Sequence, residues 1–146
     1  MLRVMTDTNT GRFVWYELLT TDVQGAIAFY TDVVGWKTQP WETGNYTMWV
    51  GSQGPLGGVT PLPDPAKQLG AAPSWQANVQ VANVDQTVET VKRLGGQVHM
   101  VEDIPTVGRF AVISDPQGAA IAIFTPKDGP QRPDTEPNVG EISWHE

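Results

Sequence analysis

The sequence contains no cysteine, which excludes disulfide bonds and every metal site built on thiolates. Its only histidines are His99 and His145, so a site that needs several imidazoles cannot form within one chain. Positive charge is also scarce, with 9 Lys and Arg against 16 Asp and Glu. The resulting net charge of −7 argues against a nucleic-acid partner, which would require clustered cations.

Long hydrophobic runs are missing as well. No apolar stretch approaches the roughly 20 residues that cross a bilayer, so we expect no membrane partner. The first residues, MLRVMTDTNTG, lack the apolar segment of a signal peptide. We therefore expect a cytoplasmic protein, and 146 residues are enough for one compact domain with a real core.

The stretch from Phe13 to Trp36 has the pattern of a strand, a sharp turn and a helix. Aromatic and large apolar residues over 13–19 favour a half-buried strand. Asp22 can cap the exposed amides of a helix over about 22–34. Gly35 can adopt the left-handed conformation that ends a helix. The helix is indicated by apolar residues at helical spacing, namely Val23, Ala26, Ile27, Tyr30, Val33 and Val34.

Three further strands are expected in this half, over residues 36–42, 46–50 and 56–60, with glycine-containing turns between them. Four prolines then fall within residues 61–73, which disfavours a regular sheet ladder there. We interpret this segment as a linker. The first half therefore has the order β-α-β-β-β, over about residues 11–60.

The second half repeats this order over about residues 74–126. Residues 75–81 alternate cleanly, so Gln76, Asn78 and Gln80 share one face of a strand. A helix capped by Asp85 is expected over 85–94, and strands over 97–102, 109–114 and 119–125. The chain is therefore an internal duplication of one unit, within a single domain over 1–146.

Residues 127–146 follow the second unit. Their first part is rich in proline and charge and should form an extended linker. The end then repeats an earlier pattern, because Gly140, Trp144 and Glu146 have the spacing of Gly11, Trp15 and Glu17. We predict a strand-like tail that pairs with a sheet edge of its own subunit or of a partner.

The duplicated plan strongly resembles the vicinal oxygen chelate superfamily, which includes glyoxalase I, bleomycin-resistance proteins and extradiol dioxygenases. The resemblance is carried by four motifs that together cover most of residues 11–126. It is nearest to bacterial glyoxalase-like proteins built of tandem domains. The motifs are D-x3-A-x2-FY-x4-GW from Asp22, VxxVDxxVxxVxxLGG from Val81, GRFAVISDPQGAAIAIF from Gly108 and GGVTPLP from Gly57.

The resemblance implies an α+β fold in which two βαβββ modules form a curved mixed sheet around a cleft, with helices outside. It also implies that enzymatic members hold a divalent metal on four strand residues. Three of these positions fall here on Trp15, Gln76 and Ala122, and the remaining one lies near 58–60, where no carboxylate occurs. Glu17 could replace Trp15 as a ligand only in a shifted register. We therefore predict that the ordinary metal centre is absent.

Several residues remain candidates for binding a ligand in the cleft. Glu17 is either an anchor or general base, or the partner of Arg109 or a backbone amide. Arg109 either contacts an anionic group of the ligand or pairs with a local carboxylate. The complete candidate set is Trp15, Glu17, Trp49, Gln76, Asn78, Arg109 and Ala122.

These features favour a metal-independent protein that binds a small aromatic or cationic molecule in its cleft, without a cofactor. The alternative is a divergent metal-dependent lyase, isomerase or dioxygenase of the same superfamily, so enzymatic activity stays open. A third interpretation is that the chain is part of a tandem protein whose site needs another module. Two modules per chain in this superfamily also imply a homodimer.

Overall fold

The computed structural model of the chain describes residues 10–41, 46–128 and 138–143. These residues form two compact units. The unit that we call the first module contains residues 15–41, 46–76 and 138–143. The second module contains residues 10–14 and 77–128, so the start of the chain belongs with its second half.

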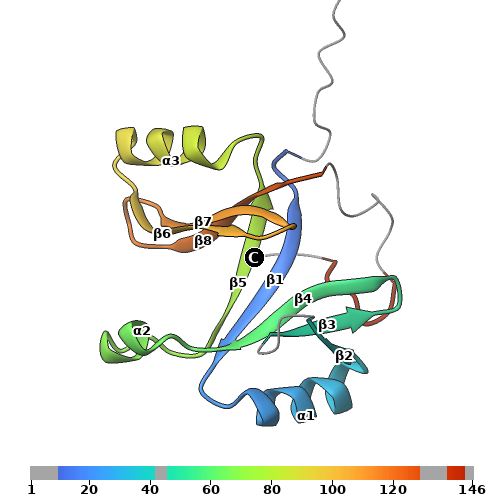
Figure 1. The fold of residues 1–146 in the computed structure, drawn as a ribbon. Coiled ribbons are helices and arrows are strands. Elements are labelled where there is room, and N and C mark those ends of the chain that lie inside the picture. Colours follow the sequence, from blue (N-terminus) through green and yellow to red (C-terminus); the bar gives the residue numbers. More distant parts are fainter. Residues whose placement is uncertain (1–9, 42–45, 129–137, 144–146) are drawn as a thin grey trace, which may run out of the picture. The chain divides into compact units, whose positions relative to one another are not determined.

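The first module is built on strands in the hydrogen-bonded order β2-β3-β4-β1. Strand β1 runs parallel to β4, whereas β3 pairs antiparallel with both β2 and β4 (Figure 1). The start of β5 also belongs to this module. The strands are β1 (Phe13–Thr20), β2 (Lys37–Pro40), β3 (Thr47–Gly51), β4 (Gly54–Pro61) and β5 (Ser74–Gln80).

Helix α1 (Val23–Val34) covers one face of this sheet. It begins where the carboxylate of Asp22 accepts a hydrogen bond from the Gly25 amide at 2.9 Å. It ends at Gly35, whose φ of 79° is the left-handed conformation that glycine adopts without strain. The buried residues beneath it are Leu18, Trp36, Trp49, Leu56 and Val59.

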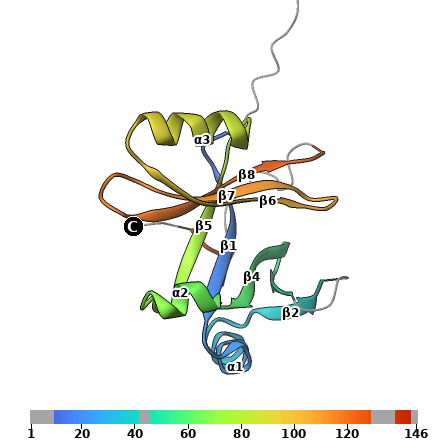
Figure 2. The same ribbon diagram turned by 60° about the vertical axis from the view of Figure 1, so that its left-hand side comes forward.

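The second module has the strand order β5-β8-β7-β6. Strand β8 pairs parallel with β5 and antiparallel with β7. Helix α3 (Val84–Arg93) lies along β6, β7 and β8 and buries Val84 and Val88 (Figure 2). The remaining strands are β6 (Gln97–Ile104), β7 (Gly108–Ser114) and β8 (Ala120–Pro126).

The α+β class and the duplicated βαβββ plan are confirmed, and both predicted helices lie within a residue or so of their expected ends. The cap of α3 is a correction, because Asn83 rather than Asp85 accepts the hydrogen bond from the Gln86 amide. The 61–73 linker is a second correction. It contains helix α2 (Asp64–Gln68), because proline is tolerated in the first turn of a helix.

The prediction of a strand-like tail is wrong for residues 138–143, the part that the structure describes. These residues form a turn and an irregular segment on the first module. The indole of Trp36 donates a hydrogen bond to the Gly140 carbonyl. The Glu141 carboxylate accepts hydrogen bonds from the Gln53 amide and the Ser52 hydroxyl, and Ile142 packs on the core. Residues 144–146 lie outside the described part.

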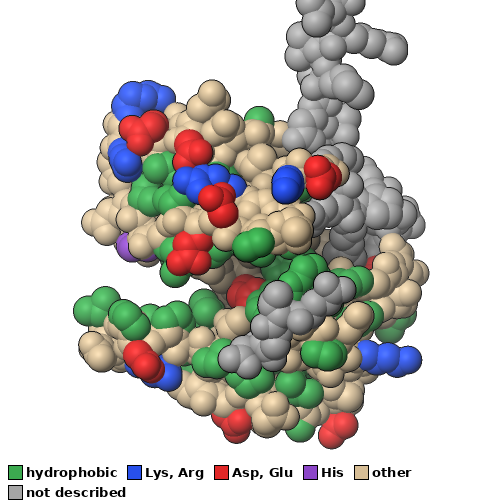
Figure 3. Space-filling model, viewed as in Figure 1, with side chains coloured by type: hydrophobic (Ala, Val, Ile, Leu, Met, Phe, Trp, Pro, Cys, Tyr) green, Lys and Arg blue, Asp and Glu red, His purple; other side chains and the backbone are tan. Residues whose placement is uncertain are grey.

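None of the described helices has the length and apolar character needed to span a bilayer. On the face shown in Figure 3, acidic and basic side chains are interspersed, and the coloured atoms include no gathered basic patch.

Candidate functional site

Strand β1 directs its side chains alternately to the two faces of the first module. Leu18 lies in the core under α1, so Trp15, Glu17 and Leu19 point to the opposite face. The register of β4 adds two residues to that face, because Glu17 pairs with Gly58 and Leu19 pairs with Thr60. Glu17 therefore lies on a sheet surface that α1 does not cover.

The Glu17 carboxylate is held through one of its two oxygens. Oε2 accepts a hydrogen bond from the Tyr46 hydroxyl at 2.6 Å and from the Trp15 indole at 3.3 Å. The Trp15 indole also donates to the Tyr46 oxygen at 2.9 Å, which closes a ring of three side chains. Oε1 is buried and has no hydrogen-bond partner among the residues that the structure describes. We call Trp15, Glu17 and Tyr46 the Glu17 site.

Gly58 makes the position of Tyr46 possible. A Cβ atom at residue 58 would overlap with the hydroxyl and ring of Tyr46. The Tyr46 hydroxyl therefore occupies the space beside β4 that a side chain at this position would fill. Because Gly58 has no side chain, the phenol of Tyr46, which precedes β3, can reach the Glu17 carboxylate on β1.

Burial controls the electrostatics of this site. Loss of solvation raises the pKa of Glu17 above 4.5, although the hydrogen bonds from Tyr46 and Trp15, and the nearby Thr60 hydroxyl, act in the opposite direction. Burial and the neighbouring carboxylate likewise raise the pKa of Tyr46, so its hydroxyl keeps its proton and acts as a donor. Such a carboxyl group could anchor a ligand or transfer a proton.

Trp49 does not line this site, contrary to expectation. Its side chain is 0% exposed and lies in the core beneath α1 with Leu18 and Trp36. The reason is the strand register, which pairs Trp49 with Gly57 and Gly57 with Tyr16. Trp49 therefore shares the face of Tyr16, not that of Glu17.

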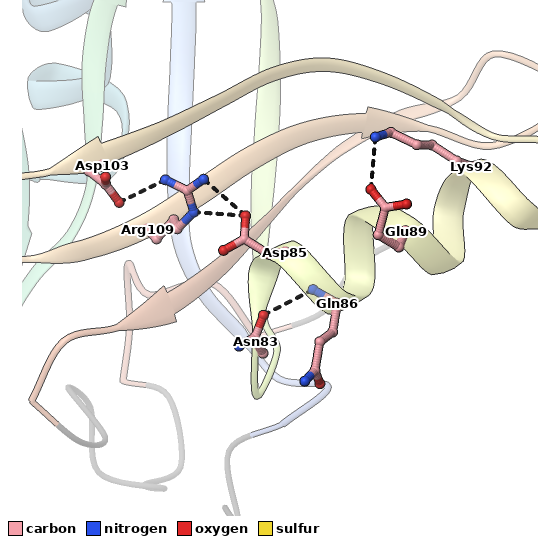
Figure 4. Close-up of polar contacts among 7 residues, drawn as sticks. All are labelled: Asn83, Asp85, Gln86, Glu89, Lys92, Asp103 and Arg109. Carbon is pink, nitrogen blue, oxygen red and sulfur yellow. Dashed lines mark hydrogen bonds and ion pairs between the residues drawn. The ribbon is translucent and has the colours of Figure 1, made fainter.

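Arg109 pairs with local carboxylates, which is the simpler of its two predicted roles. Its guanidinium donates to Asp85 on α3 at 2.9 and 3.1 Å and to Asp103 on β6 at 2.9 Å (Figure 4). The hydrogen-bond partners of Glu17 are instead Trp15 and Tyr46. Arg109 lies on the α3 side of the second module.

The remaining candidates are divided between the two modules. Gln76, in the first module, is half-buried and alternates along β5 with Trp75, whose indole donates to the Tyr30 hydroxyl on α1. Asn78 and Ala122 lie in the second module, where they are paired across β5 and β8. Ala122 is buried and Asn78 is half-buried. Their part in ligand binding stays a prediction.

The residues at the family's metal-ligand positions do not fit a divalent ion. The Trp15 indole is a hydrogen-bond donor that is already engaged, and Ala122 offers no ligand atom. In the expected 58–60 region of β4 no carboxylate occurs, and Tyr46 occupies the space beside Gly58. Among the described residues, no group of three or more His, Asp and Glu side chains converges as a metal site would require.

Sequence patterns alone do not find Tyr46 and Thr60. They place Tyr46 only at the start of a strand and Thr60 only at the end of one. The alternation of Tyr46 with Met48 and Val50 is visible, but its face can be assigned only with the β3–β4–β1 register, in which Met48 and Glu17 both pair with Gly58.

Comparison with known proteins identifies the family. A glyoxalase-like domain matches residues 15–124. "Putative glyoxylase CFP32" of Mycobacterium bovis is 38% identical over 121 residues, covering 80% of this chain and 45% of the relative. "Anthracycline biosynthesis protein DnrV" of Streptomyces peucetius is 30% identical over 135 residues, covering 82% of this chain and 49% of the relative. The chain thus spans about half the length of these relatives.

Solved structures support the fold alone. A methylmalonyl-CoA epimerase variant of Streptomyces coelicolor, in complex with 2-nitronate-propionyl-CoA, superposes with a TM-score of 0.55 at 14% identity, over 84% of this chain and 99% of the epimerase. The Mycobacterium tuberculosis epimerase gives 0.54 at 19% identity, over 86% and 93%. With the domain match over most of its length, the chain belongs to the glyoxalase-like domain family of the vicinal oxygen chelate superfamily.

Proposed function

We propose that this chain binds a small planar aromatic molecule at the Glu17 site and does so without a metal ion. One observation carries the proposal. The Glu17 carboxyl is fixed by Trp15 and Tyr46, yet its buried Oε1 has no partner in the described part of the chain. A buried polar atom without a partner is costly, so a bound molecule that supplies the missing hydrogen bond would gain affinity there.

The aromatic character of the ligand follows from the neighbours of Glu17. Trp15 is half-buried, and Tyr46 lies against its indole nitrogen. Aromatic side chains offer flat apolar surface on which a planar molecule can stack. The relatives carry names from glyoxylase and anthracycline chemistry, which is consistent with small-molecule ligands.

The metal-free part of the proposal rests on donor chemistry. Divalent ions in this fold would need carboxylate, imidazole or amide oxygen ligands from several strands. Trp15, Gly58 and Ala122 provide none of these groups. The superfamily's metal-dependent lyases, isomerases and dioxygenases are therefore the less favoured alternative for this chain.

The test is a titration with two planar bicyclic probes, neutral chromone and the cation N-methylquinolinium. Binding of either should shift the Trp15 indole N–H signal in a ¹H–¹⁵N NMR spectrum. Trp15→Phe assigns that signal and should weaken binding, because the stacking surface becomes smaller. Cyclohexanone is the non-planar control and should not bind. If neither planar probe shifts the Trp15 signal at millimolar concentration, the proposal fails.

A second candidate function is metal-independent proton transfer by Glu17, of the lyase or isomerase type. The raised pKa of this buried carboxyl favours it, because general acids and bases work best near the operating pH. Chromanone, which carries exchangeable protons beside its carbonyl, provides the test. Catalysed exchange of these protons with D₂O, lost in Glu17→Gln, would support this function, and no acceleration over buffer would oppose it.

A further inference from the structure

The two oxygens of Glu17 have different surroundings. Oε2 accepts from the Tyr46 hydroxyl and the Trp15 indole, whereas Oε1 is buried and has no donor among the described residues. If the group were ionised, half of its negative charge would lie on a buried oxygen that none of these residues stabilises with a hydrogen bond. This asymmetry suits a neutral acid that accepts hydrogen bonds at Oε2 and carries its proton at Oε1.

No positive charge compensates Glu17 within the described part of the chain. It forms no ion pair there, and its polar contacts come from uncharged groups. The net charge of −7 for the whole chain adds no support for a further buried anion. An unpaired buried charge is normally neutralised by taking up a proton.

We infer that Glu17 meets its ligand as a neutral hydrogen-bond donor, so the ligand presents an acceptor such as a carbonyl oxygen rather than a cationic group. This inference rests on the proposed function, because it names the chemistry of the molecule bound there. It narrows the aromatic or cationic class expected from the sequence to neutral planar carbonyl compounds. Since Oε1 is buried, the side chains that cover it have to move when the ligand enters.

The surroundings of Glu17 support a neutral acid. Burial raises its pKa, and Tyr46 is the one titratable group that touches it among the described residues. The pKa of Tyr46 is itself raised, so that phenol stays protonated and cannot accept the Glu17 proton. The Trp15 indole on β1 donates to Oε2 and the Thr60 hydroxyl on β4 lies nearby, and neither group carries a charge.

The isosteric variant Glu17→Gln separates the two ligand classes. A glutamine can accept from Tyr46 and Trp15 at its oxygen and donate from its amide nitrogen at the Oε1 position, as a neutral acid would. Chromone affinity should therefore change little in Glu17→Gln but fall about tenfold in Glu17→Ala, the matched variant that removes the donor. A carboxylate that anchors a cation would give the opposite pattern, with N-methylquinolinium binding lost in Glu17→Gln.

A pH titration adds a second readout. Chromone affinity of the natural protein should fall as pH rises through the pKa of Glu17, because ionisation removes the donor, whereas affinity of Glu17→Gln should not. The ¹³C signal of the Glu17 carboxyl should show the protonated form at neutral pH. An ionised Glu17 at neutral pH, or a preference for N-methylquinolinium, would overturn the inference alone. If neither probe binds, the proposed function fails and the inference fails with it.

Discussion

At the scale of single residues, the buried Glu17 carboxyl should make stability depend on pH. Its pKa is raised in the folded chain, so the folded state binds its proton more tightly than the unfolded state does. The stabilisation is therefore complete below the unfolded value of 4.5 and is lost as pH rises through the folded value. A pKa that is higher by one in the folded state corresponds to about 1.4 kcal/mol of unfolding free energy.

The substitution Glu17→Gln should abolish this loss of folding stability with rising pH. We expect urea unfolding of the natural protein and the variant to diverge from about pH 4.5 upward, with the variant gaining relative stability. Tyr46→Phe is the matched comparison. It deletes a donor that favours the ionised form, so the fall in stability with pH should continue to a higher pH. Parallel curves for all three proteins would contradict the assignment of a raised pKa to Glu17.

Single-residue roles were predictable where they depend on one strand alone. Alternation along β1 placed Trp15 and Glu17 on a common face, which the structure confirms. Trp49 was misplaced because its face depends on how β3 pairs with β4 and β4 with β1. Strand register comes from tertiary packing, and one sequence shows the alternation of a strand without showing which face is covered.

At the scale of elements, two adjacent glycines on β4 should respond differently to substitution by alanine. A Cβ at Gly57 would overlap with the Tyr16 carbonyl, which is backbone and cannot move without disturbing the β1–β4 pairing. The three atoms nearest to a Cβ at Gly58 all belong to the Tyr46 side chain, which can rotate away. We expect Gly57→Ala to cost about 1–3 kcal/mol or more in unfolding free energy.

Gly58→Ala should cost less stability but release Tyr46 from Glu17. The measurement is chemical denaturation of both variants, together with the NMR signal of the Trp15 indole, which donates to Tyr46. The signal should shift strongly in Gly58→Ala. Tyr46→Ala provides the control background, in which Gly58→Ala should have almost no further effect. A larger loss of stability in Gly58→Ala than in Gly57→Ala would contradict this expectation. It would show that moving the Tyr46 side chain costs more free energy than moving the β1 backbone.

Residues 138–143 are attached to the first module by hydrogen bonds and by packing. Glu141 links it to the turn at Ser52 and Gln53, and the Trp36 indole donates to the Gly140 carbonyl. Deleting residues 138–146 should lower the melting temperature, because these bonds and the packing of Ile142 are lost. Glu141→Ala should reproduce part of this decrease, because it lowers the free energy of unfolding by about 1 kcal/mol. An unchanged melting temperature in both variants would show that the segment contributes no stability.

The segment over residues 138–143 also shows a limit of sequence patterns. Gly140, Trp144 and Glu146 repeat the spacing of a first strand, yet the described residues 138–143 form a turn and an irregular segment. Helix α2 shows the same limit, since its prolines suggested a linker. Hydrophobic periodicity predicted the longer elements α1 and α3, whereas short segments take the conformation that their surroundings select.

At the scale of the whole molecule, the duplication was the most predictable feature. Both halves keep the order of one strand, one helix and three strands, because each must bury one sheet face under one helix. The repeated motifs also predicted the superfamily, which the domain match over residues 15–124 confirms. The site was less predictable because it depends on contacts between residues far apart in the sequence, such as Glu17 and Tyr46.

Assembly is the first prediction at this scale. In the strand orders β2-β3-β4-β1 and β5-β8-β7-β6, strands β2 and β6 lie at an end. End strands with unpaired backbone groups tend to associate, and we propose that the chain forms a homodimer. Light scattering at micromolar concentration should give a mass near twice 15.9 kDa. A mass near 15.9 kDa would contradict the proposal.

The last prediction concerns the metal content of the purified protein. A divalent ion must be held by several ligand atoms before it can polarise a substrate or activate a water molecule. The chain has an engaged indole and an alanine at two of the four expected positions and no carboxylate in the 58–60 region of the third, which leaves Gln76 as a neutral amide.

Glu17 does not restore the missing ligands, because Trp15 and Tyr46 occupy one oxygen and burial favours the neutral acid. We therefore expect elemental analysis to find no stoichiometric divalent metal and assays to find no activity on methylglyoxal–glutathione adducts. Adding nickel, zinc or iron should not change the melting temperature, since an ion that binds the folded state would raise it. One tightly held equivalent of any of these metals would overturn the metal-free proposal and favour the metal-dependent alternative.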